Sequence, residues 1–266
     1  ALRLLMKNQR DLIKKIKDKP ELRGIDDSVI KDSLEKNLKI YNINLHNLSS
    51  GDTKVLIKII RSDLRTLTGR FRKSIKSRKE LLDSSNINDL LITHTSTAER
   101  MEFYPKLALL LTNLKIKSIL DLGCGLNPIA LAKPGIKYYA SDINKEELSL
   151  IEKFFKKNKI SGNVFIADIR KIDSLSLPKA DICILFKVLD IIEKKSHKLA
   201  ENIILKSPCK YLLISFATKK LSGKPMNFPE RRWLELLINR LGYSYKTFSS
   251  NNEIFYLADK SSNAQD

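Results

Sequence analysis

The segment Ile119-Leu120-Asp121-Leu122-Gly123-Cys124-Gly125-Leu126-Asn127-Pro128 decides how this chain folds. Its first residues are typical of a buried strand, and they run directly into a glycine turn. Glycines are needed at such a turn where a ligand must approach the backbone without a Cβ in the way. A dinucleotide-binding fingerprint would require a third glycine at position 128, where this chain has proline. The segment therefore predicts a ligand-binding turn and argues against NAD.

Around this segment, β-branched and leucine-rich runs alternate with amphipathic stretches. The runs predict strands at 118–122, 137–141, 163–167, 181–186 and 211–216, with a closing antiparallel pair near 243–248 and 253–257. The stretches predict helices at 128–132, 145–158, after Val188, and at 229–241. Near-continuous apolar strands with intervening helices imply a mostly parallel sheet that is covered on both faces. The fold class is therefore α/β and Rossmann-like.

Two carboxylates end predicted strands. Asp142 lies about 20 residues after the first glycine, where an acidic side chain can accept both ribose hydroxyls of an adenosine. Asp168 ends the third strand, where it could accept from the adenine amino group. Each alone is typical of a surface or capping residue, but ligands bind at the carboxyl ends of such strands. Together with the glycine turn, they predict an adenosine site.

A dense polar segment, His94-Thr95-Ser96-Thr97-Ala98-Glu99-Arg100, precedes the first sheet strand. Ser96 or Thr97 could cap a helix that continues to Leu111. Alternatively, Arg100 is the cation that a methionine carboxylate requires, because a guanidinium binds that group through two parallel hydrogen bonds. Combined with an adenosine site and a closing hairpin, which methyltransferase sheets add, this predicts a class I methyltransferase with S-adenosylmethionine over the turn.

The chain divides into two predicted domains. Residues 1–92 show apolar side chains at helical spacing and predict a small all-helical domain, and residues 93–266 form the methyltransferase domain. No apolar run is long enough for a membrane span, and the basic N-terminus has no signal-peptide core, so we expect a cytoplasmic protein that has no membrane association. The cysteines are scattered, without a CxxC pair; we expect reduced thiols and no metal site.

The charge points to a polyanionic partner. The chain carries 49 Lys and Arg against 30 Asp and Glu, a formal net charge of +19, which favours nucleic acid. A predicted helix from Lys54 to Lys79 contains ten basic residues and one acid, Asp63. Such a stripe would bind phosphates and fix register without reading sequence. Its predicted RNA-binding residues are Lys54, Lys58, Arg61, Arg65, Arg70, Arg72, Lys73 and Lys76, followed by Arg78 and Lys79.

These residues resemble a known family, the aminoglycoside-resistance methyltransferases that modify guanine N7 in the decoding site of small-subunit (16S) ribosomal RNA (Arm/Rmt/Sgm-like, FmrO-type). The resemblance rests on the segment from His94 to Arg100 and on the turn from Asp121 to Pro128. Further similar stretches follow in the same order: 140–143, 167–168, 185–187, 215–224 and 252–256. The basic, helical character of the N-terminal region is also similar.

The resemblance implies roles for individual residues. Arg100 would contact the methionine carboxylate, Gly123 would lie under the cofactor, Asp142 would bind its ribose, and Asp168 with Ile169 its adenine. The full set of predicted cofactor-binding residues is His94, Thr97, Arg100, Gly123, Gly125, Asp142, Ile143, Asp168, Ile169 and Leu185. Lys187 and Glu253 match positions that are important to the family's activity. The implied partner is ribosomal RNA, in the assembled small ribosomal subunit, for a monomeric enzyme.

The mechanism implied for guanine N7 needs no general base, because the exposed lone pair can attack the methyl group directly. Catalysis is then mostly positioning, and Lys187 and Glu253 are expected to act in that way. The target base must be unstacked and held against apolar or aromatic side chains. Phe186, Phe228 and Trp233 are the candidates for that stacking.

Some positions depart from the family pattern. The family usually has proline at the positions of Ala217 and Asp190, and the loop after Leu221, which reads Lys224-Pro225-Met226-Asn227-Phe228-Pro229, is about two residues shorter. The exact target nucleotide and atom therefore stay open, with adenine N1 or another ribosomal RNA position as an alternative. A non-catalytic RNA-binding or ribosome-assembly factor and a small-molecule methyltransferase also stay open. Resistance and housekeeping roles are not distinguished.

Overall fold

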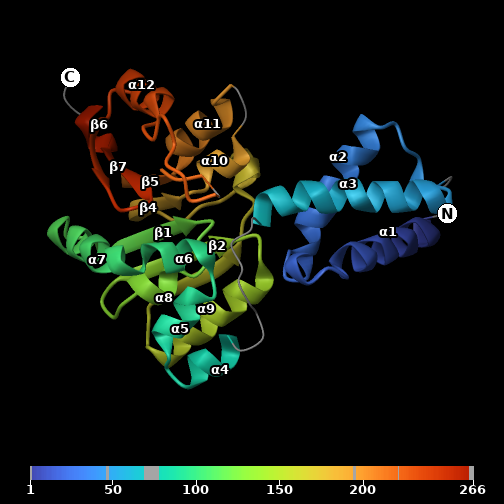
Figure 1. Cartoon of the computed structure of the whole chain (residues 1–266), viewed down its shortest axis with the longest axis horizontal. Helices are drawn as coiled ribbons and strands as arrows, with labels where there is room; N and C mark the ends of the chain where they lie inside the picture. Colours follow the sequence, from blue (N-terminus) through green and yellow to red (C-terminus); the bar gives the residue numbers. More distant parts are fainter. Residues whose placement is uncertain (1, 46–47, 69–77, 194–195, 221, 264–266) are drawn as a thin grey trace. The chain divides into compact units, whose positions relative to one another are not determined.

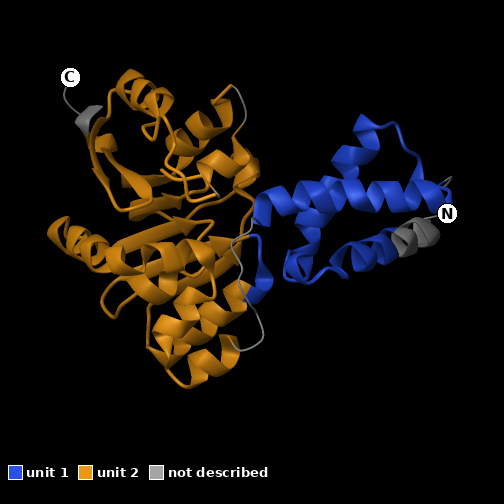
Figure 2. Ribbon diagram, in the orientation of Figure 1, with its two compact units in different colours: residues 1–72, 143–146 blue, residues 73–142, 147–266 orange. Residues whose placement is uncertain are grey.

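The computed structural model describes residues 2–45, 48–68, 78–193, 196–220 and 222–263. They belong to two compact units (Figure 2): unit 1 is residues 1–72 and 143–146, and unit 2 is residues 73–142 and 147–266. Residues 78–92, which were expected in the helical domain, thus belong to unit 2. The physical reason is hydrophobic burial: helices α4 (Arg78–Asp83) and α5 (Ile87–Ile92) place Leu82, Leu90 and Leu91 in a core of unit 2.

Unit 1 is helical. Its elements are α1 (Leu2–Lys17), η1 (Pro20–Leu22), α2 (Asp27–Ile40) and α3 (Ser50–Thr68). Their apolar faces form one core, in which Ile16, Ile30, Leu34 and Ile60 are fully buried. The segment Ile143–Glu146 belongs to this unit, because Asp26 N donates to Ile143 O over 2.9 Å and Lys145 N donates to Gly24 O over 2.8 Å.

Helix α3 differs from its prediction at its start. It begins at Ser50 rather than near Lys54, because the Ser49 hydroxyl accepts from Asp52 N over 3.1 Å and so caps the first turn. Helix α3 is described up to Thr68, and helix α4 is described from Arg78. The intervening part of the predicted Lys54–Lys79 helix, 69–77, lies outside the described residues.

Unit 2 is built on one seven-stranded sheet with the order β3-β2-β1-β4-β5-β7-β6. The strands are β1 (Ser118–Leu122), β2 (Lys137–Asp142), β3 (Gly162–Ile166), β4 (Ala180–Phe186), β5 (Cys209–Ala217), β6 (Ser244–Ser249) and β7 (Glu253–Asp259). The first five pair in parallel, whereas β7 is antiparallel to both β5 and β6. The predicted Rossmann-like sheet with its closing hairpin is therefore confirmed.

Helices cover both faces of this sheet (Figure 1). One face carries α4, α5, α7 (Tyr104–Asn113), α8 (Asn127–Leu131) and α9 (Lys145–Lys157), whose side chains share a core with Ile119 and Tyr138. The other carries η4 (Ile169–Ser174), α10 (Leu189–Ile192), α11 (Lys198–Lys206) and α12 (Arg232–Arg240), packed on Leu120 and Leu185. The helical piece expected after Val188 forms two helices, α10 and α11, and α12 begins three residues later than expected, at Arg232 rather than Pro229.

The segment before β1 folds as three short pieces, α6 (Thr95–Arg100), η3 (Met101–Phe103) and α7, rather than as one capped helix. The expected cap at Ser96 or Thr97 is wrong, since His94 is the N-cap residue of α6. The Thr97 hydroxyl instead donates to the carbonyls of Leu91 and His94 over 2.5 and 2.9 Å. The buried Thr97 side chain thus links α6 to the end of α5.

Candidate active site

The glycine turn lies at the carboxyl end of β1, where the sheet order changes direction between β1 and β4. The backbone N–H groups of Gly123 and Cys124 both donate to Ser141 O over 2.9 Å, which fixes the turn against the end of β2. Both glycines have positive φ, 73° for Gly123 and 49° for Gly125. A Cβ at Gly123 would lie 2.8 Å from Val188 Cγ2, so a bare backbone is required there.

Asp142 lies directly beside this turn. Its Oδ2 accepts a hydrogen bond from Gly125 N over 3.1 Å. Sequence reasoning put the glycine turn and the carboxylate at one site from their positions at strand ends, and the structure brings them into contact. A carboxylate at this point is placed to bind hydroxyl groups of a ligand that lies over the turn.

Asp168 follows β3 at the same edge of the sheet, because Ala167 N donates to Asp142 O over 3.2 Å. Its carboxylate is already engaged: Oδ1 accepts from Arg170 N over 3.1 Å, and the Arg170 guanidinium binds both oxygens. Asp168 therefore caps η4, which is the ordinary role of an aspartate at such a strand end. Its neighbour Ile169 is buried in the core of unit 2, and adenine binding by the two remains a prediction.

Arg100 lies at the centre of a fully buried polar network. Its Nε and Nη2 donate to the two carboxylate oxygens of Glu253 over 3.1 and 2.7 Å. Nη1 donates to Asn127 Oδ1 over 2.8 Å, and the guanidinium lies 4.4 Å from the centre of the Phe186 ring. Burial alone would lower the pKa of Arg100, but the ion pair with Glu253 outweighs it and raises that pKa.

This network changes the expectation for Arg100. All three of its side-chain nitrogens donate to protein oxygens, including those of Tyr104 and Ser96 over 3.4 and 3.3 Å. A methionine carboxylate could bind the guanidinium only by sharing or displacing one of these acceptors. The role implied by the resemblance therefore remains a prediction.

Lys187 follows β4 in the left-handed region, with φ 56°, where a residue other than glycine is strained. Its backbone N donates to Ser215 O over 3.0 Å, which holds the strand end in place. The largely buried ammonium lies 2.6 Å from Glu99 Oε2 and 3.6 Å from Glu253 Oε2. The two residues expected to position substrate, Lys187 and Glu253, are thus brought together from β4 and β7.

The remaining cofactor candidates divide into two kinds. His94 is buried, and its ring lies 3.1 Å from where a Cβ of Gly125 would be, so it borders the turn. Leu185 is fully buried in the sheet core, and Ile143 packs on the core of unit 1. For Thr97, Leu185 and Ile143, packing accounts for the side chain, and cofactor contact remains a prediction.

The sequence predictions assigned no role to Asp121, an acid of the site whose pKa is strongly raised. The residue is fully buried, accepts from the Tyr138 hydroxyl over 2.7 Å, and has no described hydrogen-bond partner at Oδ1. Burial raises the pKa of Asp121 to about 7, against the opposing effect of the Tyr138 hydrogen bond. An acid inside an apolar strand just before a glycine turn was the signal that could have found it.

Tyr104 and Asn127 were missed as well. The Tyr104 hydroxyl donates to Asn127 Oδ1 over 2.8 Å, so both hold the Arg100 guanidinium. Burial raises the pKa of Tyr104 to about 12. The available signal was the four-residue spacing from Arg100 to Tyr104, which is typical of neighbours on a helix, although the structure places Arg100 in α6 and Tyr104 in α7.

The basic residues of α3 in unit 1 fall into two groups. Lys54 and Lys58 are exposed. Arg61 donates to the carbonyls of Lys15 and Ile16 at the end of α1, and Arg65 binds Glu21 Oε1 with Nη2 over 2.7 Å. Arg61 and Arg65 thus also stabilise unit 1. Four further predicted RNA-binding residues lie outside the described residues: Arg70, Arg72, Lys73 and Lys76.

Arg78, in unit 2, does not belong to a phosphate-binding stripe. It is buried, and its Nη1 lies 3.0 Å from Glu147 Oε1 while Nη2 donates to Thr93 O over 3.0 Å. Its charge is neutralised inside the unit. The expectation that Arg78 contacts RNA is therefore wrong.

The described part of the chain shows neither a metal cluster nor a membrane span. Within it, no group of three or more His, Cys, Asp or Glu side chains is arranged to hold a metal ion. Among the same residues, no helix combines the length and hydrophobicity needed to cross a membrane. The cysteines Cys124, Cys183 and Cys209 are free thiols, as expected.

Comparison with known proteins finds that a family model described as ribosomal RNA methyltransferase (FmrO) matches residues 81–257. The 16S rRNA (guanine(1405)-N(7))-methyltransferase of Serratia marcescens is 25% identical over 191 residues, which cover 68% of this chain and 74% of that protein. The protein of the same description from Frankia casuarinae is 24% identical over 62% of this chain, and the match spans only 60% of that relative.

Solved structures share the fold over nearly the whole chain. The 16S rRNA methyltransferase RmtF, solved in complex with S-adenosyl-L-homocysteine, has a TM-score of 0.77 and 20% identity. The 16S rRNA methylase RmtB has a TM-score of 0.74 and 18% identity. Each comparison covers 95% of this chain and 98% of the other. At these identities the likeness concerns the fold alone.

Proposed function

The chain belongs to the FmrO family of ribosomal RNA methyltransferases, and we propose that it methylates N7 of a guanine in the decoding region of 16S ribosomal RNA. The family resemblance and the enzyme class expected from the sequence are thereby confirmed. The nucleotide is taken from the relatives described as guanine(1405)-N7 methyltransferases. Methylation there would confer aminoglycoside resistance.

The methyl donor is S-adenosylmethionine, and the observation that carries the proposal is the contact between Asp142 and the glycine turn. The Asp142 carboxylate, 3.1 Å from Gly125 N, lies where parallel sheets bind the ribose of an adenosine ligand. Gly123 and Gly125 supply the positive φ of the turn beside it, with Val188 and His94 packed where their side chains would be. The residues of the turn therefore fit a nucleoside-containing cofactor of this class.

S-adenosylmethionine supplies a sulfonium-bound methyl group. Guanine N7, which carries no proton, supplies the lone pair that attacks it. The protein therefore needs no general base and acts by alignment, which can provide roughly 7 to 11 kcal/mol of the barrier. Lys187 fits this task, because its largely buried ammonium is fixed between Glu99 and Glu253. Guanine presents the acceptors N7 and O6 on one edge, so a lysine donor to O6 would orient N7.

Glu253 would act through its neighbours rather than on the base. Its carboxylate accepts from Arg100 on one side, accepts from the Ser215 hydroxyl, and lies 3.6 Å from the Lys187 ammonium. Removing Glu253 would therefore disturb both cations of the site. We assign it a positioning role.

The proposal is tested by incubating the protein with small ribosomal subunits and labelled S-adenosylmethionine, followed by mapping of the modified base. Label at guanine N7 of the decoding region is the expected result. Label at adenine N1 would support the different target that the shortened, altered loop around Lys224–Pro229 suggests. Absence of label from RNA would refute methyl transfer to RNA and favour a non-catalytic or small-molecule role.

RNA binding by unit 1 is part of the same proposal. Lys54 and Lys58 are exposed one turn apart on α3, where they can contact phosphates. We expect Lys54→Gln with Lys58→Gln to weaken binding of the small subunit and to leave the affinity for S-adenosylmethionine unchanged. We further propose an assembled small subunit as the substrate, a monomeric enzyme and a cytoplasmic location.

A further inference from the structure

Phe228 is an exposed aromatic side chain in unit 2. Its exposed fraction is 84%, the largest among the exposed large hydrophobic side chains of the described residues. Of the three stacking candidates, Phe186 is buried under the Arg100 guanidinium, and Trp233 stacks on His197 with ring centres 4.1 Å apart. Among these three, only Phe228 is exposed.

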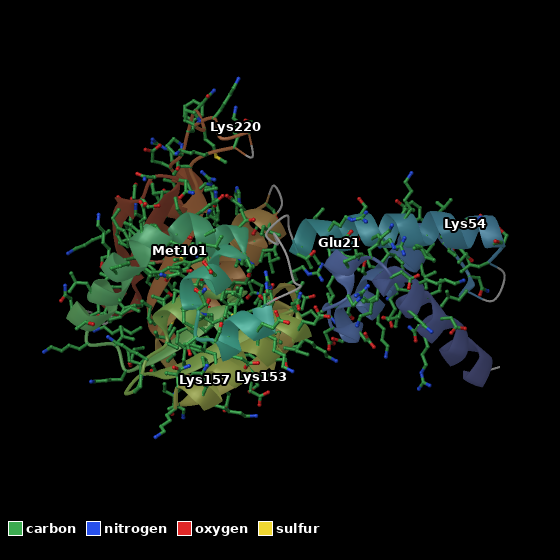
Figure 3. All side chains as sticks on the ribbon, turned by 60° about the horizontal axis from the view of Figure 1, so that its bottom comes forward. Glu21, Lys54, Met101, Lys153, Lys157 and Lys220 are labelled. Atoms are coloured by element: carbon green, nitrogen blue, oxygen red, sulfur yellow. The ribbon has the colours of Figure 1, made fainter. Side chains whose placement is uncertain are left out.

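Phe228 ends a loop that carries only positive charge. This basic loop consists of residues 218–220 and 222–228. It contains the exposed lysines Lys219, Lys220 and Lys224, and no acidic residue. Figure 3 shows that the side chains around Lys220 project away from the body of unit 2. An exposed aromatic ring in the same loop as exposed lysines matches what single-stranded nucleic acid requires, namely stacking and phosphate binding.

Backbone hydrogen bonds link the two sides of the basic loop. Lys220 N donates to Lys224 O and Met226 N donates to Thr218 O, each over 2.8 Å. Gly223 supplies the left-handed φ of 80° that the turn requires. Pro229 restricts the backbone of Phe228 to extended conformations.

Both ends of the basic loop are tied to the active-site edge of the sheet. At its start, Ala217 pairs with Glu253 across β5 and β7. After its end, Arg231 donates through Nη2 to Ala217 O over 3.3 Å and to Asp190 Oδ2 over 2.8 Å, and Asp190 lies three residues after Lys187. The loop therefore projects from the same edge that holds Lys187 and Glu253.

We propose that the basic loop is a second RNA-binding surface, in which Phe228 stacks on an unpaired base close to the target nucleotide and Lys219, Lys220 and Lys224 bind the adjoining phosphates. The inference rests on the proposed function, because it names how the RNA substrate is held. A single exposed hydrophobic residue is ordinary on a protein surface. The combination of an exposed ring, exposed lysines and anchoring at the active-site edge is what points to RNA.

The test measures binding of small ribosomal subunits and the KM and kcat of methyl transfer for Phe228→Ala. Removal of one stacking ring predicts a roughly tenfold or larger fall in affinity and a similar rise in KM. Phe228→Trp, which keeps a stacking face, is expected to restore both. The matched control is Leu109→Ala on α7, a residue 60% exposed, which should leave both unchanged.

The charges are tested with Lys220→Gln/Lys224→Gln. These two substitutions should weaken binding. They should also make the slope of the logarithm of the binding constant against the logarithm of the salt concentration shallower, by roughly 0.7 to 0.9 for each phosphate that is no longer bound. The control is Lys117→Gln with Lys179→Gln. These exposed lysines precede β1 and β4, at the amino ends of the two strands, whereas the candidate active site lies at their carboxyl ends. In titration calorimetry, every variant should bind S-adenosylmethionine with the same affinity as the unsubstituted protein.

The outcomes separate the two proposals. If the natural chain labels RNA and Phe228→Ala binds and reacts like Leu109→Ala, the role of the basic loop is overturned while the proposed function stands. If the natural chain leaves RNA unlabelled, the proposed function fails, and subunit binding by the same variants still decides whether the loop contacts RNA. A fall in cofactor affinity in Phe228→Ala would assign the residue to folding and would overturn the inference.

Discussion

The guanidinium of Arg100 and the carboxylate of Glu253, 153 residues apart in the chain, form a two-point ion pair that is fully buried in unit 2. The pair joins the helical segment before β1 to the start of β7. Because Glu253 also lies 3.6 Å from the Lys187 ammonium, it links three segments that meet at the carboxyl edge of the sheet.

Replacing Glu253 with Ala should leave the buried Arg100 charge without its partner. Breaking a buried pair from one side costs about 3 to 5 kcal/mol, so we expect the free energy of unfolding to fall by that amount. Urea denaturation followed by the fluorescence of Trp233, the single tryptophan, reports on unit 2. Glu152→Ala, which removes the exposed partner of Lys156, is the control and should cost less than about 1 kcal/mol.

Replacing Asp142 with Ala should weaken binding of S-adenosylmethionine. Hydrogen bonds to a charged group contribute about 1.5 to 3 kcal/mol each, so the affinity should fall about 10- to 100-fold. Titration calorimetry measures it. Asp173→Ala removes an exposed carboxylate that binds Lys206, and it should keep the natural affinity. Equal affinities for the two variants would exclude Asp142 from the cofactor site.

Asp121 should make the stability of unit 2 depend on pH. Its pKa rises from 3.8 to about 7 on folding, so the folded state binds the proton more tightly than the unfolded state does. The resulting stabilisation is fully present below about pH 4 and is lost as pH rises through about 7. Compared with Asp121→Asn, the natural chain should lose roughly 4 kcal/mol of unfolding free energy between these limits.

The measurement is urea denaturation of both proteins at a series of pH values. The difference between their free energies of unfolding at each pH removes the contributions of titratable groups that the substitution does not affect. A difference that is independent of pH between 4 and 8, or that grows in favour of the natural chain as pH rises, would contradict the shifted pKa of Asp121.

Gly162 should not tolerate any side chain. Its φ is 146°, and a Cβ there would overlap the carbonyl of Tyr138, its partner on β2. We expect Gly162→Ala to separate the start of β3 from β2 and to destabilise unit 2 by more than about 3 kcal/mol. Gly135→Ala is the matched control: φ is also positive, at 87°, but the space around the new Cβ is open. It should cost only about 1 to 2 kcal/mol.

The strand plan and the cofactor turn could be predicted from the sequence because both rest on local patterns. β1 was predicted at its observed ends, and the other strands within one or two residues, since apolar runs with β-branched residues decide them. The contact between Asp142 and Gly125 was also predictable, because parallel strands that end in register bring their following residues together.

Other features depended on distant parts of the chain. Residues 78–92 belong to unit 2 because Leu82, Leu90 and Leu91 are buried in its core, which helical periodicity alone does not reveal. Arg78 looked like a continuation of the basic stripe, but Glu147 neutralises it from 69 residues away. Charge counted along a helix does not show which cations are paired.

The sequence by itself determined the α/β sheet, the glycine turn and the carboxylate beside it, since each follows from residue type and short-range spacing. Only the tertiary structure decided which side chains are already occupied and which face solvent. It paired Arg100 with Glu253, placed Phe186 under Arg100, and left Phe228 exposed. Burial and ion pairing are set by packing between segments that are far apart in the chain, so the same residue types serve the interior in one place and the surface in another.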